Sequence, residues 1–154
     1  MNTSTADREI TITRLLDAPR ELVFEAWTKP EHISRWWGPN GFSATTKEMT
    51  VKPGSRWLFT LNGPDNMSFP SRIQYIEVVK PEKLVYEHGY DVEDDPQRFL
   101  VTVTFENAAG KTKLTMHTIF RTKEQLEMVK SFGAIEKGNE TIDHLVAYLK
   151  EMSH

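Results

Sequence analysis

The alternation of hydrophobic and polar residues predicts that the chain begins with a strand and a short helix. Isoleucines alternate with polar residues over Glu9–Leu15, a pattern typical of a half-buried strand. The sequence Asp17-Ala18-Pro19 then places a capping carboxylate and a proline where a helix begins. Four apolar residues share one face of that helix: Leu22, Val23, Ala26 and Trp27.

A second short helix is predicted within the stretch Ala26–Gly41, which holds three of the chain's four tryptophans. Thr28 and Glu31 have the spacing of a capping box, in which each side chain satisfies a free backbone N–H of the first turn. Three residues then share one helical face: Ile33, Trp36 and Trp37. A turn sequence that cannot stay helical ends the element: Gly38-Pro39-Asn40-Gly41.

The middle of the chain, residues 42–120, alternates with the period of strands. The predicted strands are Phe42–Met49, Trp57–Leu61, Arg72–Val79, Leu84–Tyr90, Phe99–Phe105 and Thr112–Phe120. Short turns between them predict an antiparallel meander, because parallel pairs need long crossovers. Within Arg72–Val79, Ile73 and Tyr75 are expected on one face, opposite a second set made of Gln74, Ile76 and Val78.

The last third of the chain changes to helical spacing. Thr122 and Gln125 form a second predicted capping box, and a short helix is expected to end near Gly133. A longer helix follows, with five apolar residues on one face: Ile142, Leu145, Val146, Leu149 and Met152. Together these elements predict an α+β helix-grip fold, in which a curved antiparallel sheet wraps around a long C-terminal helix. We expect one domain over residues 9–152 and a flexible N-terminus over residues 1–8.

Composition narrows the classes of function. The 154 residues carry a formal net charge of −3, and no basic cluster is interleaved with exposed aromatics, so a nucleic-acid partner is not expected. The chain has no cysteine, which excludes disulfides and thiol nucleophiles. It shows no signal peptide or membrane-length apolar run, so we expect a cytoplasmic protein without a membrane partner. Composition leaves open whether the protein is a monomer or a homodimer.

The apolar strand faces and the last helix supply the candidates for a ligand cavity. They are Trp57, Phe59, Tyr75, Tyr86, Phe99, Val101 and Met116 on strands, with Ile142 and Val146 on the helix. Each would serve equally well in an ordinary core. Because adjacent helical residues point about 100° apart, we expect one of Trp36 and Trp37 to pack and the other to reach a cavity rim.

His88 is the candidate residue that could add a reactive polar group to such a cavity. If Leu84 and Tyr86 face inward, His88 is a polar group in an apolar site that could orient a ligand or move a proton. If Val85 faces inward instead, His88 is exposed. Three of the other four histidines read as outward-facing: His32, His117 and His144. No pair of histidines has a recognised ligand spacing, so neither a metal site nor a cofactor is expected. The chain also lacks a nucleophile elbow and a phosphate-binding loop, so catalytic residues remain unassigned.

Several segments resemble one known family. They are residues 14–32 (Arg14-Leu-Leu-Asp-Ala-Pro-Arg-Glu-Leu-Val-Phe-Glu-Ala-Trp-Thr-Lys-Pro-Glu-His32), Arg35-Trp36-Trp37-Gly38-Pro39, Pro53-Gly54 with Trp57, and residues 78–84 (Val78-Val-Lys-Pro-Glu-Lys-Leu84). In this order they resemble the homologues of the activator of the heat-shock-protein-ninety ATPase, within the START-like, Bet v 1-like (SRPBCC) superfamily. The resemblance covers Ile10–Leu149. It implies a deep, mostly apolar cavity between the sheet and the C-terminal helix.

The chain departs from the family pattern at two places. Ser55 stands where a second glycine commonly follows Pro-Gly, and Asn139 stands where a tryptophan commonly follows the glycine early in the last helix. The loss of that aromatic side chain bears on the size and polarity of the cavity mouth.

Three functions follow from the sequence, in this order. The first is a non-enzymatic protein that binds an apolar or aromatic small molecule. The second is an enzyme of the cyclase or dehydratase type, with His88, Tyr75 and Tyr86 as general acids or bases. The third, from the family resemblance alone, is an interaction protein that stimulates a chaperone ATPase. It ranks last, because the better-known activators carry a chaperone-binding extension that this chain is expected to lack.

Overall fold

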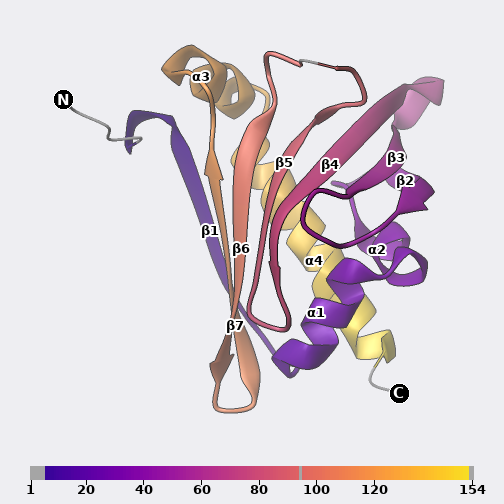
Figure 1. Cartoon of the computed structure of the whole chain (residues 1–154), viewed down its shortest axis with the longest axis vertical. Helices are drawn as coiled ribbons and strands as arrows, with labels where there is room; N and C mark the ends of the chain where they lie inside the picture. Colours follow the sequence, from indigo (N-terminus) through magenta and orange to yellow (C-terminus); the bar gives the residue numbers. More distant parts are fainter. Residues whose placement is uncertain (1–5, 94, 153–154) are drawn as a thin grey trace.

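A seven-stranded antiparallel sheet forms the centre of the computed structural model, which describes residues 6–93 and 95–152 (Figure 1). The strands are β1 (Glu9–Leu16), β2 (Ser43–Met49), β3 (Arg56–Asn62), β4 (Ser68–Val79), β5 (Lys83–Tyr90), β6 (Phe99–Ala108) and β7 (Lys111–Ile119). Their order across the sheet is β1-β7-β6-β5-β4-β3-β2. Strands β2 to β7 therefore form a continuous meander, and β1 closes its far edge beside β7.

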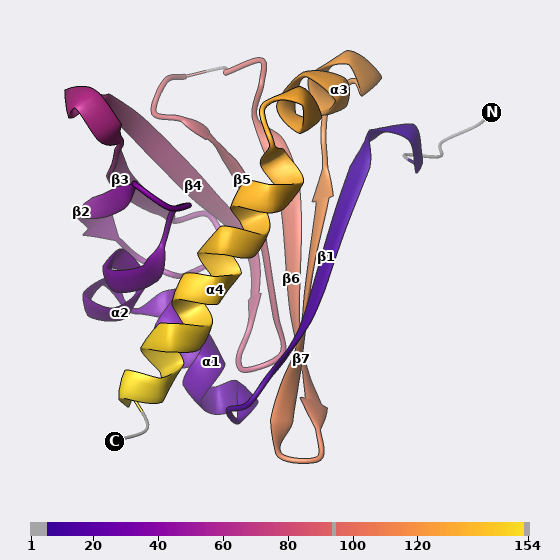
Figure 2. The same ribbon diagram turned by 180° about the vertical axis from the view of Figure 1, so that it is seen from behind.

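The helices cover one face of this sheet. They are α1 (Arg20–Thr28), α2 (Pro30–Trp36), α3 (Lys123–Ser131) and α4 (Ala134–Met152), with short turns at Ala6–Arg8 and Pro64–Asn66. Seen from behind, α4 crosses the sheet diagonally, with α3 near its first residues and α1 and α2 near its last (Figure 2). The predicted α+β helix-grip fold, with two short helices after the first strand, is confirmed.

The junction between α1 and α2 differs from the predicted capping box. Thr28 is the last residue of α1, and its hydroxyl donates to the Phe24 carbonyl at 2.8 Å. Lys29 is the N-cap of α2, and its side chain makes no capping hydrogen bond. Pro30 explains the difference, because a residue before proline is held extended and proline favours the first helical turn. The prediction that Thr28 and Glu31 form a capping box was therefore wrong.

A bulge in β4 changes which side chains face the core. The register with β5 shifts after Tyr75, and the extra residue, Ile76, is 49% exposed. Tyr75 pairs with Tyr86 and Val78 pairs with Leu84, so Val78 lies on the buried face. The prediction that Val78 shares a face with Ile76 was wrong, because one inserted residue reverses the alternation beyond it.

The second predicted capping box is half confirmed at the start of α3. The Thr122 hydroxyl accepts the backbone N–H of Gln125 at 3.0 Å. The Gln125 side-chain oxygen instead accepts the backbone N–H of Arg121 at 2.9 Å. The predicted break near Gly133 is confirmed, since α3 ends at Ser131 and Gly133 has a φ of +81°, typical of a residue that follows a helix.

The predicted flexible end, residues 1–8, lies partly outside the described residues, which begin at Ala6. Ala6–Arg8 form one short turn. The Arg8 guanidinium donates to the carbonyl of Phe120, and the N–H of Phe120 donates to the carbonyl of Arg8 at 2.9 Å. These two bonds join the turn to the end of β7.

The core is densely filled where α1 and α2 meet the sheet. The ring centroid of Trp27 lies 4.8 Å from that of Trp36 and 5.7 Å from that of Phe105, both edge-on. The Trp36 indole N–H donates to the Ala26 carbonyl at 3.0 Å, so this buried polar group is satisfied. Three residues of α4 are buried in the same core: Ile142, Leu145 and Leu149. This end of the grip leaves little room for a ligand.

Candidate functional site

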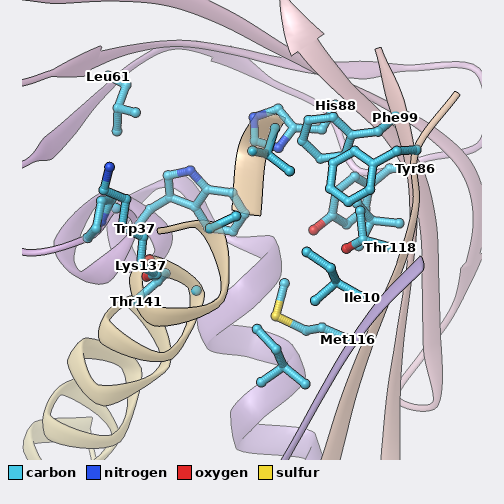
Figure 3. Close-up of a pocket in the computed structure, with 18 of the residues that line it drawn as sticks. Ile10, Trp37, Leu61, Tyr86, His88, Phe99, Met116, Thr118, Lys137 and Thr141 are labelled. Carbon is cyan, nitrogen blue, oxygen red and sulfur yellow. Dashed lines mark hydrogen bonds between the residues drawn. The ribbon is translucent and has the colours of Figure 1, made fainter. Parts of the chain in front are cut away.

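A cavity of about 340 Å³ lies between the sheet and the first turns of α4 (Figure 3). We call it the inner cavity. Five strands line it with Ile10, Ile12, Leu61, Tyr86, His88, Phe99, Val101, Met116 and Thr118. The helical side is lined by Trp27 of α1, Val129 of α3, and Ala134, Lys137, Gly138 and Thr141 of α4. Most of these side chains are apolar, as in typical small-molecule sites.

Trp37 forms the wall of the inner cavity opposite the sheet (Figure 3). It is the C-cap of α2 and has an extended backbone, so it does not continue the helical face of Ile33 and Trp36. Its ring lies edge-on to Trp57 at 5.3 Å, and also contacts His88 at 6.0 Å. The side chain is therefore held from one side and faces the cavity on the other.

The turn that carries Trp37 is bonded to α4. The two ring nitrogens of His144 lie 2.8 Å from the Gly38 carbonyl and 2.7 Å from the Asn40 side-chain oxygen. The backbone N–H of Asn40 donates to Glu140 at 3.0 Å. Gly38 has a φ of +108°, which a residue with a side chain rarely adopts. These bonds fix the cavity wall to the helix.

The structure brings six of the twelve predicted site residues to the inner cavity: Trp37, Tyr86, His88, Phe99, Val101 and Met116. Five others are buried in the core outside its lining: Trp36, Trp57, Phe59, Tyr75 and Ile142. Val146 is half-buried beside that core. Trp57 and Phe59 stack with centroids 3.8 Å apart and lie behind Trp37, so they support the wall without forming it.

On α4 the lining residues lie nearer the N-terminus than the sequence indicated. Ala134 to Thr141 line the cavity, whereas Ile142 and Val146 lie beyond it. The aromatic core of α1 and α2 fills the space beside the later turns. Gly138 permits a close approach to β1, since a Cβ there would lie 2.7 Å from the Ile12 δ-methyl. Neither the packing of α1 and α2 beside α4 nor the approach of Gly138 to Ile12 can be predicted from the spacing of apolar residues in the sequence.

The sequence analysis also missed lining residues on the edge strands. Ile10 and Ile12 were recognised as the buried side of a strand, but not as neighbours of β7. Thr118 lies two residues after Met116, so strand alternation alone would have placed it on the same face. Its hydroxyl points into the cavity and has no hydrogen-bond partner among residues 6–93 and 95–152 (Figure 3).

His88 faces inward, as one of the two sequence alternatives required. Leu84 and Tyr86 of the same strand are buried, and His88 lines the cavity two residues further on. The ring keeps some accessible surface towards the cavity but is enclosed by neighbouring residues. This desolvation lowers the pKa of His88 from 6.5 to about 4, so the imidazole is neutral at pH 7.

The two candidate tyrosines have different positions. Tyr86 lines the cavity, and its burial raises the pKa of its hydroxyl, an effect that the Trp27 indole N–H opposes. Tyr75 pairs with Tyr86 across the strands but lies in the core, and burial likewise raises the pKa of its hydroxyl. Both phenols stay protonated at neutral pH. Tyr75 does not line the inner cavity.

A second cavity of about 350 Å³ adjoins the first. We call it the outer cavity. It shares Leu61, His88, Phe99 and Val129 with the inner cavity and is otherwise lined by Phe42, Phe69, Ser71, Gly89, Tyr90, Asp95, Gln97 and Gln125. Its wall is more polar. His88 thus lies at the boundary between an apolar and a more polar chamber.

The loop between β5 and β6 is fixed beside the outer cavity. The buried Asp95 carboxylate accepts the backbone N–H groups of Tyr90 and Gln97, each at 2.9 Å. Arg72 is 8% exposed and its guanidinium donates to Asp91 at 2.8 and 3.0 Å. These hydrogen bonds attach Asp91 and Asp95 to the neighbouring strands and loop backbone.

The remaining histidines form no cluster. His117 faces away from the core, as predicted, and its side chain bonds to Glu9. His32 contacts the Tyr148 hydroxyl at 2.6 Å, and His144 binds the turn that carries Trp37. Both were expected to be surface residues, but each has a partner within the fold. Across the described part of the chain, no three histidines or carboxylates come together as metal ligands would. No described helix has both the length and the hydropathy needed to cross a membrane.

The fold and the cavity define a helix-grip domain with an interior chamber between its sheet and its last helix. The profile of the family described as "Activator of Hsp90 ATPase homolog 1-like protein" matches residues 17–150. This match covers most of the 154 residues, so the chain belongs to that family. The resemblance found in the sequence is confirmed.

Solved structures show the same fold. An Arthrobacter aurescens protein, solved by NMR, has 24% identity and a TM-score of 0.88 over 97% of this chain and 90% of its own. A Mycobacterium smegmatis protein has 24% identity and a TM-score of 0.86, with 98% and 96% covered. A Nitrosomonas europaea protein has 21% identity and a TM-score of 0.87, with 96% and 97% covered. No curated protein sequence matches significantly.

Proposed function

We propose that this protein binds an apolar small molecule in the inner cavity and does not chemically alter it. The observation that carries the proposal is the cavity itself, about 340 Å³ in volume and walled mainly by apolar side chains. This volume lies within the range of about 300 to 1,000 Å³ typical of small-molecule sites. Membership of the family is consistent with this role and does not name the ligand.

The wall favours a flat, aromatic ligand. Trp37 and Phe99 present rings to the chamber from opposite sides (Figure 3), and Val101 and Met116 add aliphatic surface to its lining. Aromatic rings stack on one another or meet edge to face, and methionine fits irregular shapes. A rigid ring system also loses little conformational entropy on binding.

Tryptophan fluorescence and thermal stability test this proposal. Fatty acids, flavonoids and polyketide-like aromatics are added one at a time, and a ligand is expected to change the fluorescence and raise Tm. The Trp37→Phe variant should lose much of the fluorescence change, because Trp37 and Trp27 are the tryptophans that line the cavity. If no compound in a broad apolar set changes either signal, the proposal is wrong.

The second candidate is a cyclase or dehydratase activity, favoured by one observation. Tyr86 and His88 lie two residues apart on β5 and both line the cavity. A neutral imidazole can accept a proton and a protonated phenol can donate one. Tyr75 is not part of this arrangement. Incubation with hydroxyketone and polyketide-like substrates, followed by mass spectrometry for loss of water, separates this activity from binding.

Other expectations from the sequence stay predictions. A chaperone partner ranks last, and a pull-down that finds no association would remove it. Cytoplasmic location and a monomeric or homodimeric state also stay predictions, as does the absence of nucleic-acid and membrane partners. Size-exclusion chromatography coupled to light scattering would determine the oligomeric state.

A further inference from the structure

His88 has hydrogen-bonding capacity that the protein does not use. Neither ring nitrogen has a hydrogen-bond partner within residues 6–93 and 95–152. Its ring is surrounded by other rings, with centroids 5.0 Å away at Phe99 and 6.0 Å away at both Trp37 and Phe59. A buried polar group without a partner is unfavourable. A ligand that fills the chamber would supply the missing partner.

The form of the imidazole determines what that partner can be. Desolvation keeps the pKa of His88 near 4, so at neutral pH the ring has one N–H donor and one nitrogen acceptor. A neutral imidazole does not provide the positive charge that a buried carboxylate needs. A hydroxyl group can both donate and accept, and therefore suits either ring nitrogen.

The charged groups around the two cavities also disfavour an anion. Among their described lining residues, Lys137 and Asp95 carry formal charges. The Lys137 ammonium donates to the carbonyl of Phe132 at 2.7 Å on the exposed side of the helix. Asp95 is buried and places a negative charge on the wall of the outer cavity. A carboxylate that reached from His88 towards the outer cavity would therefore meet the like charge of Asp95, and the Lys137 ammonium is held against the helix on its exposed side.

We propose that the ligand is an uncharged aromatic molecule with a hydroxyl group that hydrogen-bonds to His88 at the boundary of the two cavities. The aromatic body occupies the inner cavity against Trp37, and the hydroxyl lies towards the more polar outer cavity. This assignment rests on the proposed function of the inner cavity. It adds the chemical class of the ligand, and it separates neutral hydroxylated aromatics from fatty acids and other carboxylates.

Three matched probes test the proposal: naphthalene, 2-naphthol and 2-naphthoate. They share one ring system and differ in having no polar group, a neutral hydroxyl or a carboxylate. Calorimetric titrations at pH 7 should show 2-naphthol binding about 3- to 10-fold more tightly than naphthalene, the range of one net hydrogen bond. Binding of 2-naphthoate should be weaker than that of both.

The His88→Phe variant keeps a ring and removes the hydrogen bond. It should still bind naphthalene, and its preference for 2-naphthol should fall to about 1-fold. His117→Phe is the matched control, because His117 faces away from the core and should leave the preference unchanged. If His88→Phe does not fold, ¹⁵N spectra of the wild-type imidazole answer the same question. The ring nitrogens of His88 should shift with 2-naphthol and not with naphthalene.

The outcomes distinguish this proposal from the function on which it rests. Equal binding of naphthalene and 2-naphthol overturns the role of His88 and leaves the apolar binding site intact. Tightest binding of 2-naphthoate overturns the assignment to neutral ligands in the same way. If none of the three probes binds, the proposed function itself fails.

Discussion

The two ends of the helix grip use the same kinds of side chain for different purposes. At the end where α1 and α2 meet the sheet, Trp36 and Phe105 each pack against Trp27 and fill the space under α4, and Trp27 also reaches the lining of the inner cavity. At the end where α4 begins, Trp37 and Phe99 stand on opposite walls of a cavity of about 340 Å³. Aromatic content alone therefore does not separate a core from a binding site.

The difference arises from backbone geometry. Trp36 is the last residue of α2 and points into the closed end, whereas Trp37 leaves the helix with an extended backbone and faces the cavity. Substitutions at the closed end, where α1 and α2 meet the sheet, should lower the free energy of unfolding more than substitutions at the open end, where α4 begins.

The largest effect is expected from removing one of the two adjacent tryptophans. Trp36→Ala deletes an enclosed ring and its hydrogen bond to Ala26, so it should lower the free energy of unfolding by about 3–5 kcal/mol. Trp37→Ala should cost clearly less, because that ring already faces a cavity. Urea denaturation of both variants measures the difference. Equal losses would mean that the two ends are equally packed.

The sequence predicted that Trp36 and Trp37 lie beside a turn. It did not predict the backbone geometry that directs their side chains to different ends of the grip. The proximity of Trp36 and Trp37 to a turn was evident, but the role of Pro30 in setting the start of α2 was not recognised. The order of β2 to β7 followed from short turns, whereas the position of β1 beside β7 did not. The bulge at Ile76 did not, because a bulge depends on pairing with β5, which alternation within one strand does not report.

The site was predictable to the extent that strand alternation determines faces. Val101 and Met116 came from that alternation, which also put Tyr86 and His88 on one face but left open whether that face lines the cavity. The extent of the cavity along α4 did not, since Ile142 and Val146 have the same helical spacing as any core face. Where the lining stops depends on how far α1 and α2 fill the sheet, which is a tertiary property.

Acid should destabilise the protein through His88. Burial lowers the pKa of His88 to about 4, against 6.5 for the free group. Between these values the unfolded chain binds a proton that the folded chain does not, so stability is lost as the pH falls from 6.5 towards 4. The full loss from this group is about 3 kcal/mol, at 1.36 kcal/mol per pKa unit.

Urea denaturation of the wild type and His88→Phe at pH 7, 5.5 and 4.5 checks this prediction. The variant should lose less stability on acidification, because its other titratable groups are those of the wild type. If the two proteins lose the same amount, His88 titrates normally and is not enclosed.

The same substitution, threonine to valine, at two positions of β7 compares the closed and open ends of the grip. Thr112 is fully buried at the closed end, and its hydroxyl donates to the Ala18 carbonyl at 2.7 Å. Thr112→Val should cost about 1–2 kcal/mol, because the acceptor loses its partner. Thr118→Val should change stability by no more than about 0.5 kcal/mol, since no described residue bonds that hydroxyl. Thermal unfolding of both variants measures the two losses of stability. A larger loss for Thr118→Val than for Thr112→Val would contradict the comparison of the two ends.

The smallest effects are expected at two glycines, Gly133 between α3 and α4 and Gly138 within α4. Gly133→Ala should cost about 1 kcal/mol, because its φ of +81° strains any residue with a side chain. At Gly138 the new methyl group meets the end of the Ile12 side chain, which can rotate into the cavity. The gain in helix propensity, up to about 1 kcal/mol, should offset that shift. A larger loss at Gly138 than at Gly133 would indicate a filled interior.

The central claim is that the open end binds an apolar molecule between α4 and the sheet. It is tested most directly by NMR with naphthalene, through intermolecular nuclear Overhauser effects to side-chain methyl groups. Contacts are expected to the methyl groups of Met116 and Val101 and to the ring of Trp37, which line the inner cavity. Contacts confined to exposed side chains such as Met128 and Phe132, with none to the cavity, would contradict it.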